Sequence, residues 1–381
     1  MKFLSVACML FLAAGASAQN RLLYVNNQTS PNNTITAFSI NPNGSLTQLA
    51  TSPFQTGGNG GGQVPIEGLA IVPIGRADYL YATNGTDGSV SALTLNPQTG
   101  VLTPVAGSPF TLNDTSGTYY VTASPDHRFL FVSNITDTDI HVLAISRNTG
   151  ALSEISGSPF QAGANIAGLE VTPNNRFLLA AANSIDAIDV FNIGSSGALT
   201  PVAGSPFPAA GSAIAIQTNC TGNQVFAVNN STNTIDAYTL AANGTLAPVP
   251  GAPFSNGLTT SGSNSFDLAL APNDRFLFTT DSFSSDLSSL SVAPGGSLRP
   301  VAGSPVATSN WEGGTAITAA GDLLYSVQFS TGAVDARRIG PNGVLTTVPG
   351  TPFANPFNPG NDSLPDSVIS FPAPACSAGP R

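Results

Sequence analysis

Four acidic residues of this chain occupy nearly the same position relative to short apolar segments that recur along the sequence. Glu67, Asp267, Glu312 and Asp366 each lie at the entrance to such a segment. Two carboxyl groups can divide the work of a general acid and a general base when their environments separate their pKa values. We therefore take these four residues as candidate catalytic groups. The alternative is that they are solvated loop acids in an acidic protein.

Aromatic residues lie at the same level of these segments. Carboxylates beside aromatic rings suit a sugar-like or cationic ligand. The sequence requires no cofactor, and Ca²⁺ is an example of a cation that would fit, because it binds carboxylate and carbonyl oxygens. The candidate ligand-binding residues are Tyr119, Tyr120, Phe266 and Trp311, together with Glu170, which lies deeper along its segment.

The charge composition argues against several other chemistries. The net charge is −10, only 8% of the residues are charged, and Lys2 is the only lysine. Lys2 lies in a predicted signal peptide, so the mature chain has no lysine for a Schiff base and too few clustered cations for a nucleic-acid partner. His127 and His141 occupy positions that repeat along the chain, which indicates structural roles. The sequence has no Ser-His-Asp spacing, phosphate-binding glycine loop or Cys/His metal cluster.

The elements that position the candidate residues are repeated. A motif of the form G-S-P-F returns roughly every 50 residues, and such a period indicates an array of supersecondary units. Because its Phe recurs at one repeat position, we expect Phe110, Phe160, Phe207 and Phe254 to be buried. The seven copies are Thr51–Phe54, Gly107–Phe110, Gly157–Phe160, Gly204–Phe207, Gly251–Phe254, Gly303–Val306 and Gly350–Phe353.

Each repeat contains four short strand-like segments. The first is apolar and aromatic, as in 129–132; the second alternates, as in 188–191; and a turn with Gly follows. The third carries Pro at 104, 201, 248 and 300, which predicts the edge of a sheet because proline lacks an N–H donor. The fourth follows the G-S-P-F motif and is small and apolar, as suits a central axis. Four antiparallel strands in each of seven repeats predict an all-β, seven-bladed β-propeller.

The two ends of the chain predict how the ring closes. The first strand, 22–25, is of the first type, and the last, 368–371, is of the fourth type. The C-terminal strand should therefore complete the N-terminal blade from the inside. The loops that enter the fourth strands should then build the mouth of a central channel, where the candidate residues lie.

Residues 1–18 predict a secretory signal peptide. Lys2 supplies the positive start, 3–14 the apolar core, and Ala16-Ser17-Ala18 the cleavage site. The apolar core is too short for a transmembrane helix. We expect residues 19–381 to form a single propeller domain that is monomeric, without a membrane span, and secreted or periplasmic.

Two cysteines remain after removal of the signal peptide. Cys220 and Cys376 form a disulfide if the exported chain brings them together. Both follow strands of the fourth type, but three blades apart on the ring. A bridge would require the C-terminal tail to cross one face of the propeller, so the sequence leaves the pairing open.

Two segments carry a family resemblance. Residues 124–134, Ser-Pro-Asp-His-Arg-Phe-Leu-Phe-Val-Ser-Asn, and 172–178, Thr-Pro-Asn-Asn-Arg-Phe-Leu, resemble the blade repeat S-P-D-G-R-F-L-Y-V-x-N of the seven-bladed lactonase family. That family contains bacterial 6-phosphogluconolactonases and fungal muconate cyclases. The resemblance covers the whole mature chain and implies the propeller fold and a lactone substrate.

The chain departs from this family at the expected mouth. The resemblance implies His and Arg just before the inner strands, but the matching segments 117–120 and 264–267 contain neither. A phosphorylated lactone needs cationic partners, so we expect a neutral substrate. Three interpretations remain open: a secreted lactonase-like hydrolase of a neutral lactone or sugar, a non-catalytic propeller that binds a glycan or a protein, and a structural envelope protein.

Overall fold

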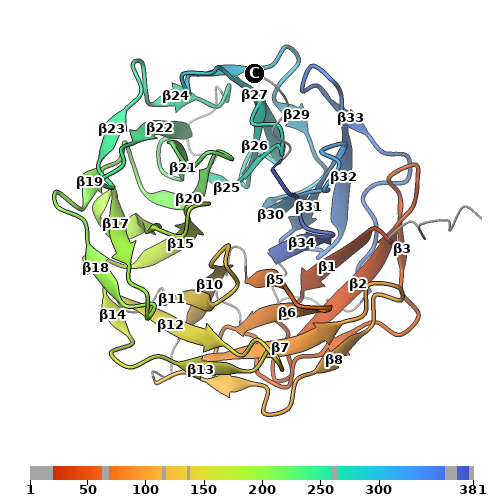
Figure 1. Ribbon diagram of the computed structural model, residues 1–381. Helices are drawn as coiled ribbons and strands as arrows, with labels where there is room; N and C mark the ends of the chain where they lie inside the picture. The colour runs from red at the N-terminus through yellow and green to blue at the C-terminus, as the bar shows by residue number, and fades with distance from the viewer. Residues whose placement is uncertain are drawn as a thin grey trace, which may run out of the picture.

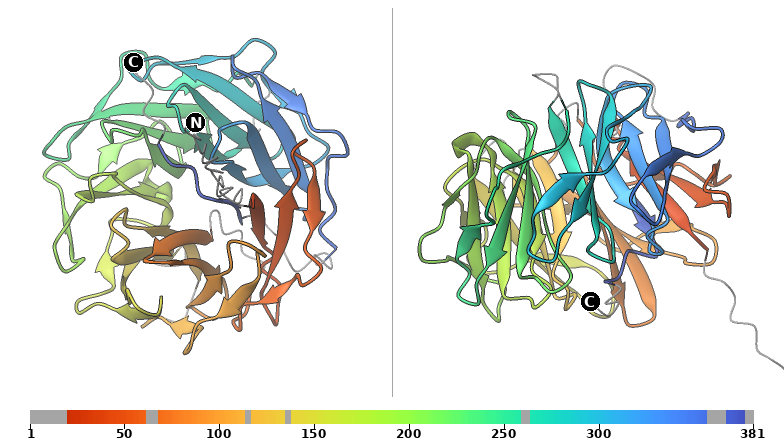
Figure 2. Two further views of the ribbon diagram at one scale, coloured as in Figure 1. Left: turned by 45° about the vertical axis from the view of Figure 1, so that its right-hand side comes forward. Right: turned by 90° about the horizontal axis from the view of Figure 1, so that it is seen from above.

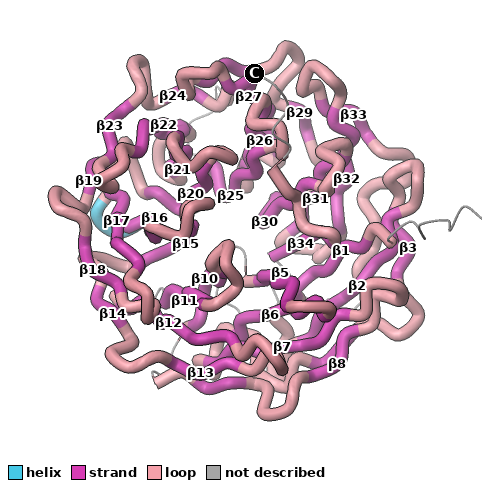
Figure 3. The backbone as a smooth tube through the Cα atoms, viewed as in Figure 1, coloured by secondary structure: helices cyan, strands magenta, loops and turns pink. Residues whose placement is uncertain are grey.

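Seven antiparallel sheets surround a central axis and form the predicted seven-bladed propeller (Figure 1). The computed structural model describes residues 20–61, 68–113, 117–134, 138–258, 264–356 and 367–376. Nearly all of this is strand or loop (Figure 3), with one short 3₁₀ helix, η1 (Asn183–Ile185). The inner strands, one per blade, are β34 (Ser367–Phe371), β5 (Leu69–Ile74), β10 (Thr118–Ala123), β15 (Ile166–Val171), β20 (Ala213–Thr218), β25 (Ser265–Leu270) and β30 (Glu312–Ile317).

The second and third strands of each blade form the middle of the sheet. The second strands are β1 (Leu22–Asn26), β6 (Ala77–Asn84), β11 (Phe129–Asn134), β16 (Phe177–Ala182), β21 (Gln224–Asn229), β26 (Phe276–Asp281) and β31 (Leu323–Gln328). The third strands are β2 (Thr34–Ile40), β7 (Ser89–Leu95), β12 (Asp139–Ile145), β17 (Ala187–Ile193), β22 (Thr234–Leu240), β27 (Asp286–Val292) and β32 (Val334–Ile339).

The outer strands of the blades are β3 (Leu46–Gln48), β8 (Leu102–Pro104), β13 (Leu152–Glu154), β18 (Leu199–Pro201), β23 (Leu246–Pro248), β28 (Leu298–Pro300) and β33 (Leu345–Thr347). Four of the seven outer strands, β8, β18, β23 and β28, carry the prolines expected at a sheet edge. Six blades add a two-residue strand that pairs with the third strand beyond the end of the outer one: β4 (Phe54–Gln55), β9 (Phe110–Thr111), β14 (Phe160–Gln161), β19 (Phe207–Pro208), β24 (Phe254–Ser255) and β29 (Val306–Ala307).

The hydroxyl group of the G-S-P-F motif holds this short strand in place. The Ser158 hydroxyl accepts a hydrogen bond from the Val142 amide of the third strand at 2.9 Å, and Ser52, Ser108, Ser205, Ser304 and Thr351 make the same contact in their blades. The following aromatic residue packs at the edge of the blade. Phe110, Phe160, Phe207 and Phe254 therefore pack against the hydrophobic core but are only half-buried, less than the sequence predicted.

Neighbouring blades are joined by a repeated hydrogen bond between a second strand and a glycine turn. The Tyr24 hydroxyl donates to the Gly100 carbonyl at 3.0 Å, Tyr81 to Gly150 at 2.9 Å, and Tyr325 to Gly44 at 2.8 Å. All three glycines have a positive φ, between 70° and 89°, which a glycine adopts without steric cost. The apolar side chains between the blades form the core around these contacts.

The ring closes as the chain ends predict. β34 pairs antiparallel with β1, from Leu22 opposite Phe371 to Asn26 opposite Ser367. β34 is thus the inner strand of the N-terminal blade, and the last strand of the chain completes the sheet of the first.

The cysteine pairing that the sequence left open is resolved by the fold. Cys220 and Cys376 form a disulfide with their Cα atoms 5.4 Å apart. Residues after β34 run along one face of the ring to reach Cys220, and the C-terminal end lies on that face in the right-hand view of Figure 2. We call this the lower face; it carries the turns between inner and second strands. The upper face carries the loops that enter the inner strands.

Candidate functional site

An aromatic pocket of about 260 Å³ lies at the upper ends of three inner strands. These are β20, β25 and β30, from three consecutive blades. The loops before the inner strands and those after the second strands supply the pocket wall. The pocket is lined by Ile214, Asn230, Asn264, Phe266, Ser282, Phe283, Trp311 and Phe329.

Four aromatic rings form two perpendicular pairs in this pocket. Phe266 and Phe329 lie with their ring centroids 4.8 Å apart at 90°, and Phe283 and Trp311 lie 4.8 Å apart at 79°. Edge-to-face pairs of this kind are favourable contacts. Trp311 is 45% exposed and Phe283 is 52% exposed. Large apolar side chains left open to solvent side by side make this pocket the candidate binding surface.

Backbone hydrogen bonds hold the walls of the aromatic pocket together. The Phe329 amide donates to the Trp311 carbonyl at 2.9 Å, and the Ser282 amide donates to the Asn264 carbonyl at 2.9 Å. The Ser282 hydroxyl also reaches the next blade and donates to the Glu312 carbonyl at 2.8 Å. The pocket is thus preformed, which lowers the entropic cost of binding a ligand.

The pocket aromatics replace small polar residues at equivalent positions of other blades. The residue just before the inner strand is Trp311 in one blade, but Asn165, Ser212 and Asn264 in three others. The first residue after the second strand is Phe329 in one blade and Asn183, Asn230 or Ser282 elsewhere. The next residue is Phe283 in its blade and Ser184, Ser231 or Ser330 elsewhere. We did not predict Phe283 and Phe329, and this departure from the repeat is the signal that would have identified them.

Glu312 follows Trp311 but does not line the aromatic pocket. Its side chain is fully buried, accepts a hydrogen bond from the Ser326 hydroxyl at 2.6 Å and lies 3.5 Å from the Gln328 amide nitrogen. Burial raises the pKa of Glu312 to about 7, with a smaller contribution from the charge of Asp335, although the Ser326 hydroxyl opposes the increase. Glu312 is therefore protonated to a large extent near neutral pH, unlike an ordinary glutamate, but in this conformation it is not in contact with solvent.

Asp267 has a structural position between two blades. It is fully buried; its carboxylate accepts a hydrogen bond from the Leu268 amide at 2.8 Å and one from the Thr315 amide at 2.7 Å. The second bond joins β25 to β30. A carboxylate with two backbone donors is well suited to hold the inner strands in register.

The remaining candidate residues are dispersed. Tyr120 is buried in the hydrophobic core, and Glu170 lies toward the lower end of its strand, where it accepts hydrogen bonds from the Thr218 amide and hydroxyl at 3.3 and 3.1 Å. Glu67, Asp366 and the side chain of Tyr119 lie outside the described residues. The fold thus brings together Phe266 and Trp311 and separates Glu170 and Tyr120 from them.

The aromatic pocket has no positive side chain among the described residues that line it. Its polar groups are the amides of Asn230 and Asn264 and the hydroxyl of Ser282. Within the described parts of the chain, no group of three or more His, Cys, Asp or Glu side chains is arranged to hold a metal ion. The arrangement suits a ligand that stacks on rings and makes a few neutral hydrogen bonds.

Comparisons with known proteins agree with the fold. The family model described as lactonase, seven-bladed beta-propeller, matches residues 71–214, which cover the three blades from β5 to β19. The structure of a periplasmic gluconolactonase from Pseudomonas aeruginosa superposes with a TM-score of 0.75 and 16% identity, over 92% of this chain and 99% of that one. No curated protein matches the chain by sequence.

Two further structures give a similar result. A proposed 6-phosphogluconolactonase from Bacteroides fragilis has a TM-score of 0.74 and 19% identity, over 93% of this chain and 98% of that one. Another from Bacteroides uniformis has a TM-score of 0.71 and 16% identity, over 92% and 99%. The resemblance to the lactonase-like propellers is confirmed for the fold. At these identities the similarity shows the fold alone, because one fold hosts many unrelated activities.

Proposed function

We propose that this lactonase-like propeller binds a neutral, ring-shaped small molecule, a sugar or a sugar lactone, in the aromatic pocket. The observation that carries the proposal is the exposed pair Phe283 and Trp311 beside the amides of Asn230 and Asn264. Binding sites for small molecules combine apolar walls with a few polar groups that orient the ligand. The C–H face of a sugar ring would lie on the aromatic pair, and its hydroxyl groups would face the amides.

The described residues that line the pocket include no cation, which supports a neutral ligand. Phosphate recognition relies on Arg or Lys side chains that form charge-assisted hydrogen bonds. The mature chain has no lysine, and an acidic chain of net charge −10 repels anions at long range. We therefore expect δ-gluconolactone or a neutral sugar to bind better than a phosphorylated one.

Hydrolysis of the bound lactone is a second candidate, favoured by the position of Glu312. A general acid or base is most effective when its pKa lies near the working pH, and Glu312, with a pKa of about 7, directly follows the pocket residue Trp311. Turnover would require a movement that exposes this buried carboxyl group to the pocket. Glu67 and Asp366 remain candidate partners for it. Without such movement the protein would be a non-catalytic propeller that binds a glycan.

Export of the chain is part of the proposal. The disulfide between Cys220 and Cys376 supports an oxidising compartment, secreted or periplasmic. No helix in the described residues has the length and apolar character needed to cross a bilayer. Mass spectrometry of the protein recovered outside the cytoplasm should give a mature chain that begins at Gln19, and retention of residues 1–18 would contradict this.

Calorimetric titration tests the ligand class. δ-Gluconolactone, glucose, a neutral oligosaccharide, 6-phosphogluconate and tetramethylammonium are compared on the wild type and on Trp311→Ala. We expect binding of a neutral ring compound and a loss of at least tenfold in affinity in the variant. Ile185→Ala is the matched control, because Ile185 is also exposed, at 46%, but lies in η1 of another blade.

Three outcomes would contradict parts of this proposal. Preferential binding of 6-phosphogluconate would reject the neutral ligand class, and preferential binding of tetramethylammonium would identify a cation site instead. Equal affinities of wild type and Trp311→Ala would place the binding site elsewhere. Release of acid from δ-gluconolactone in a pH-stat assay, lost in Glu312→Gln, would distinguish the hydrolase from the binding protein.

A further inference from the structure

The residues after β34 lie across the lower end of the central channel. Pro374 lines a cavity of about 170 Å³ together with inner-strand residues such as Leu69, Ala269, Ile317 and Val368. These residues belong to four different blades. The tail therefore covers the channel at the end opposite the aromatic pocket.

The tail is held mainly by its disulfide. Residues 373–376 are exposed and belong to no strand. Within the described chain, residues 372–376 make no hydrogen bond. Pairing with β1 ends at Phe371. The bond to Cys220 is thus the contact that fixes the path of the tail beyond the sheet.

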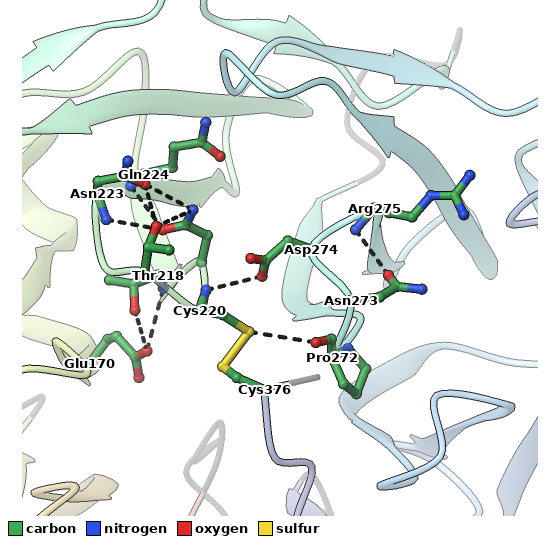
Figure 4. The surroundings of a disulfide bond; sticks show 12 residues. Glu170, Thr218, Cys220, Asn223, Gln224, Pro272, Asn273, Asp274, Arg275 and Cys376 are labelled. Carbon is green, nitrogen blue, oxygen red and sulfur yellow. Dashed lines mark hydrogen bonds between the residues drawn. A yellow bond between two sulfur atoms is a disulfide. The ribbon is translucent and has the colours of Figure 1, made fainter. Parts of the chain in front are cut away.

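Hydrogen bonds surround the Cys220 end of the disulfide (Figure 4). Cys220 lies in the turn between β20 and β21, where the Asn219 side-chain oxygen accepts hydrogen bonds from the Asn223 and Gln224 amides at 3.0 Å each. The Cys220 amide donates to the Asp274 carboxylate of the next blade at 3.0 Å. The exposed tail is therefore attached to a turn that is itself braced by its neighbour.

We propose that the Cys220–Cys376 disulfide is a redox latch that keeps the lower end of the channel covered. Reduction breaks the sulfur–sulfur bond and adds two electrons and two protons, which leaves two thiols. A dithiol supplies both electrons and both protons and becomes a cyclic disulfide; a phosphine supplies the electrons, and one water molecule supplies the two protons and the oxygen of the resulting phosphine oxide. Freed of this bond, residues 372–376 gain conformational entropy and leave the channel. The lower end then opens, while the blades and the aromatic pocket keep their structure.

Alanine methyl NMR provides probes at the required places. Ala373 and Ala375 report on the tail, Ala269 and Ala316 line the covered cavity, and Ala92 is buried in the blade of β5–β8 as a control. On addition of phosphine to the mature protein, we expect the tail methyls to narrow to random-coil signals and the cavity methyls to shift. The Ala92 signal should stay in place, since that blade remains folded.

Cys376→Ser is the matched variant. Its spectrum without reductant should reproduce that of the reduced wild type, and phosphine should leave it unchanged, because the mature chain has no other disulfide. Unchanged tail and cavity methyls after both thiols have been alkylated would overturn the latch. So would a disulfide that is reduced only when the whole protein unfolds. Because wild-type reduction starts from folded protein, the test does not depend on how well the variant folds.

Discussion

Replacement of Glu312 by Gln should make the protein less sensitive to pH. In the wild type the buried carboxyl group has a pKa of about 7, compared with 4.5 for an ordinary glutamate. The folded state therefore holds this proton more tightly than the unfolded state. The resulting stabilisation is fully present below about pH 4.5 and is lost as the pH rises through 7. Gln has nearly the same shape and cannot ionise.

The size of the effect follows from the difference between the two pKa values. A tenfold change in proton affinity is worth about 1.4 kcal/mol, so the full effect is about 3 kcal/mol, of which roughly 2.5 kcal/mol falls between pH 5 and pH 8. Burial also raises the pKa of Asp281, to about 6. The stability that this group loses as the pH rises is similar in both proteins, so it cancels in the comparison. The Ser326 hydroxyl can still donate to the amide oxygen of Gln, so we expect the two proteins to differ by no more than about 1 kcal/mol at pH 5.

Urea denaturation at pH 5 and pH 8 gives the change in the free energy of unfolding for each protein, and the two changes are then compared. The free energy of unfolding of Glu312→Gln should fall by about 2–3 kcal/mol less than that of the wild type over this range. Asp126→Asn is the control, because it replaces a carboxyl group by an amide on a side chain that is 34% exposed in a lower turn, and the change in Glu312→Gln is judged against it. If Glu312→Gln declines as steeply as the wild type, Glu312 is not protonated in the folded state and our account of the buried carboxyl is wrong.

Four further measurements test the fold and the cofactor. The double variant Cys220→Ser, Cys376→Ser removes a bridge that closes a loop of 156 residues, and chain entropy gives an upper value of about 5 kcal/mol for its contribution. We expect the free energy of unfolding in urea to fall by about 2–5 kcal/mol, and an unchanged midpoint would contradict this. Phe160→Ala removes a half-buried ring and should cost about 1–3 kcal/mol, below the loss for a fully buried one; an unaltered thermal melt would show that the ring packs on nothing. Tyr325→Phe deletes the hydrogen bond to the Gly44 carbonyl and should lower the free energy of unfolding, measured in urea, by about 1 kcal/mol; a variant more stable than the wild type would contradict this. The Ca²⁺ site remains a prediction: excess CaCl₂ should raise the melting temperature relative to EDTA, and equal melting temperatures would remove it.

The architecture could be predicted because each blade repeats its own local pattern. Within one period the chain contains an apolar strand, an alternating strand, a glycine turn, a proline-bearing edge strand and a small inner strand. These preferences act over a few residues, so they can be recognised without knowledge of distant contacts. The unequal ends, 22–25 and 368–371, also determined that the last strand would pair with β1.

The composition of the pocket depends on the direction in which each side chain points, and the repeat pattern of the sequence did not reveal these directions. Successive side chains of a strand point to opposite faces, and small register shifts in β25 and β30 change which residues face the pocket. Asp267 and Glu312 were aligned with the mouth of the channel but point into the interior, where backbone amides or a hydroxyl satisfy them. Aligning the repeats at the start of the inner strand was therefore not sufficient to identify residues whose side chains are exposed to solvent.

Contacts between distant parts of the chain were decided by the ring as a whole. Phe283 and Phe329 join Phe266 and Trp311 only because consecutive blades bring their upper loops together. The disulfide likewise depends on a tail that crosses the lower face to Cys220. By itself, the sequence determined seven blades, their strand order and their closure. The tertiary structure decided the aromatic pocket, the burial of the carboxylates and the cysteine pairing, because these follow from side-chain direction and blade packing over long sequence separations.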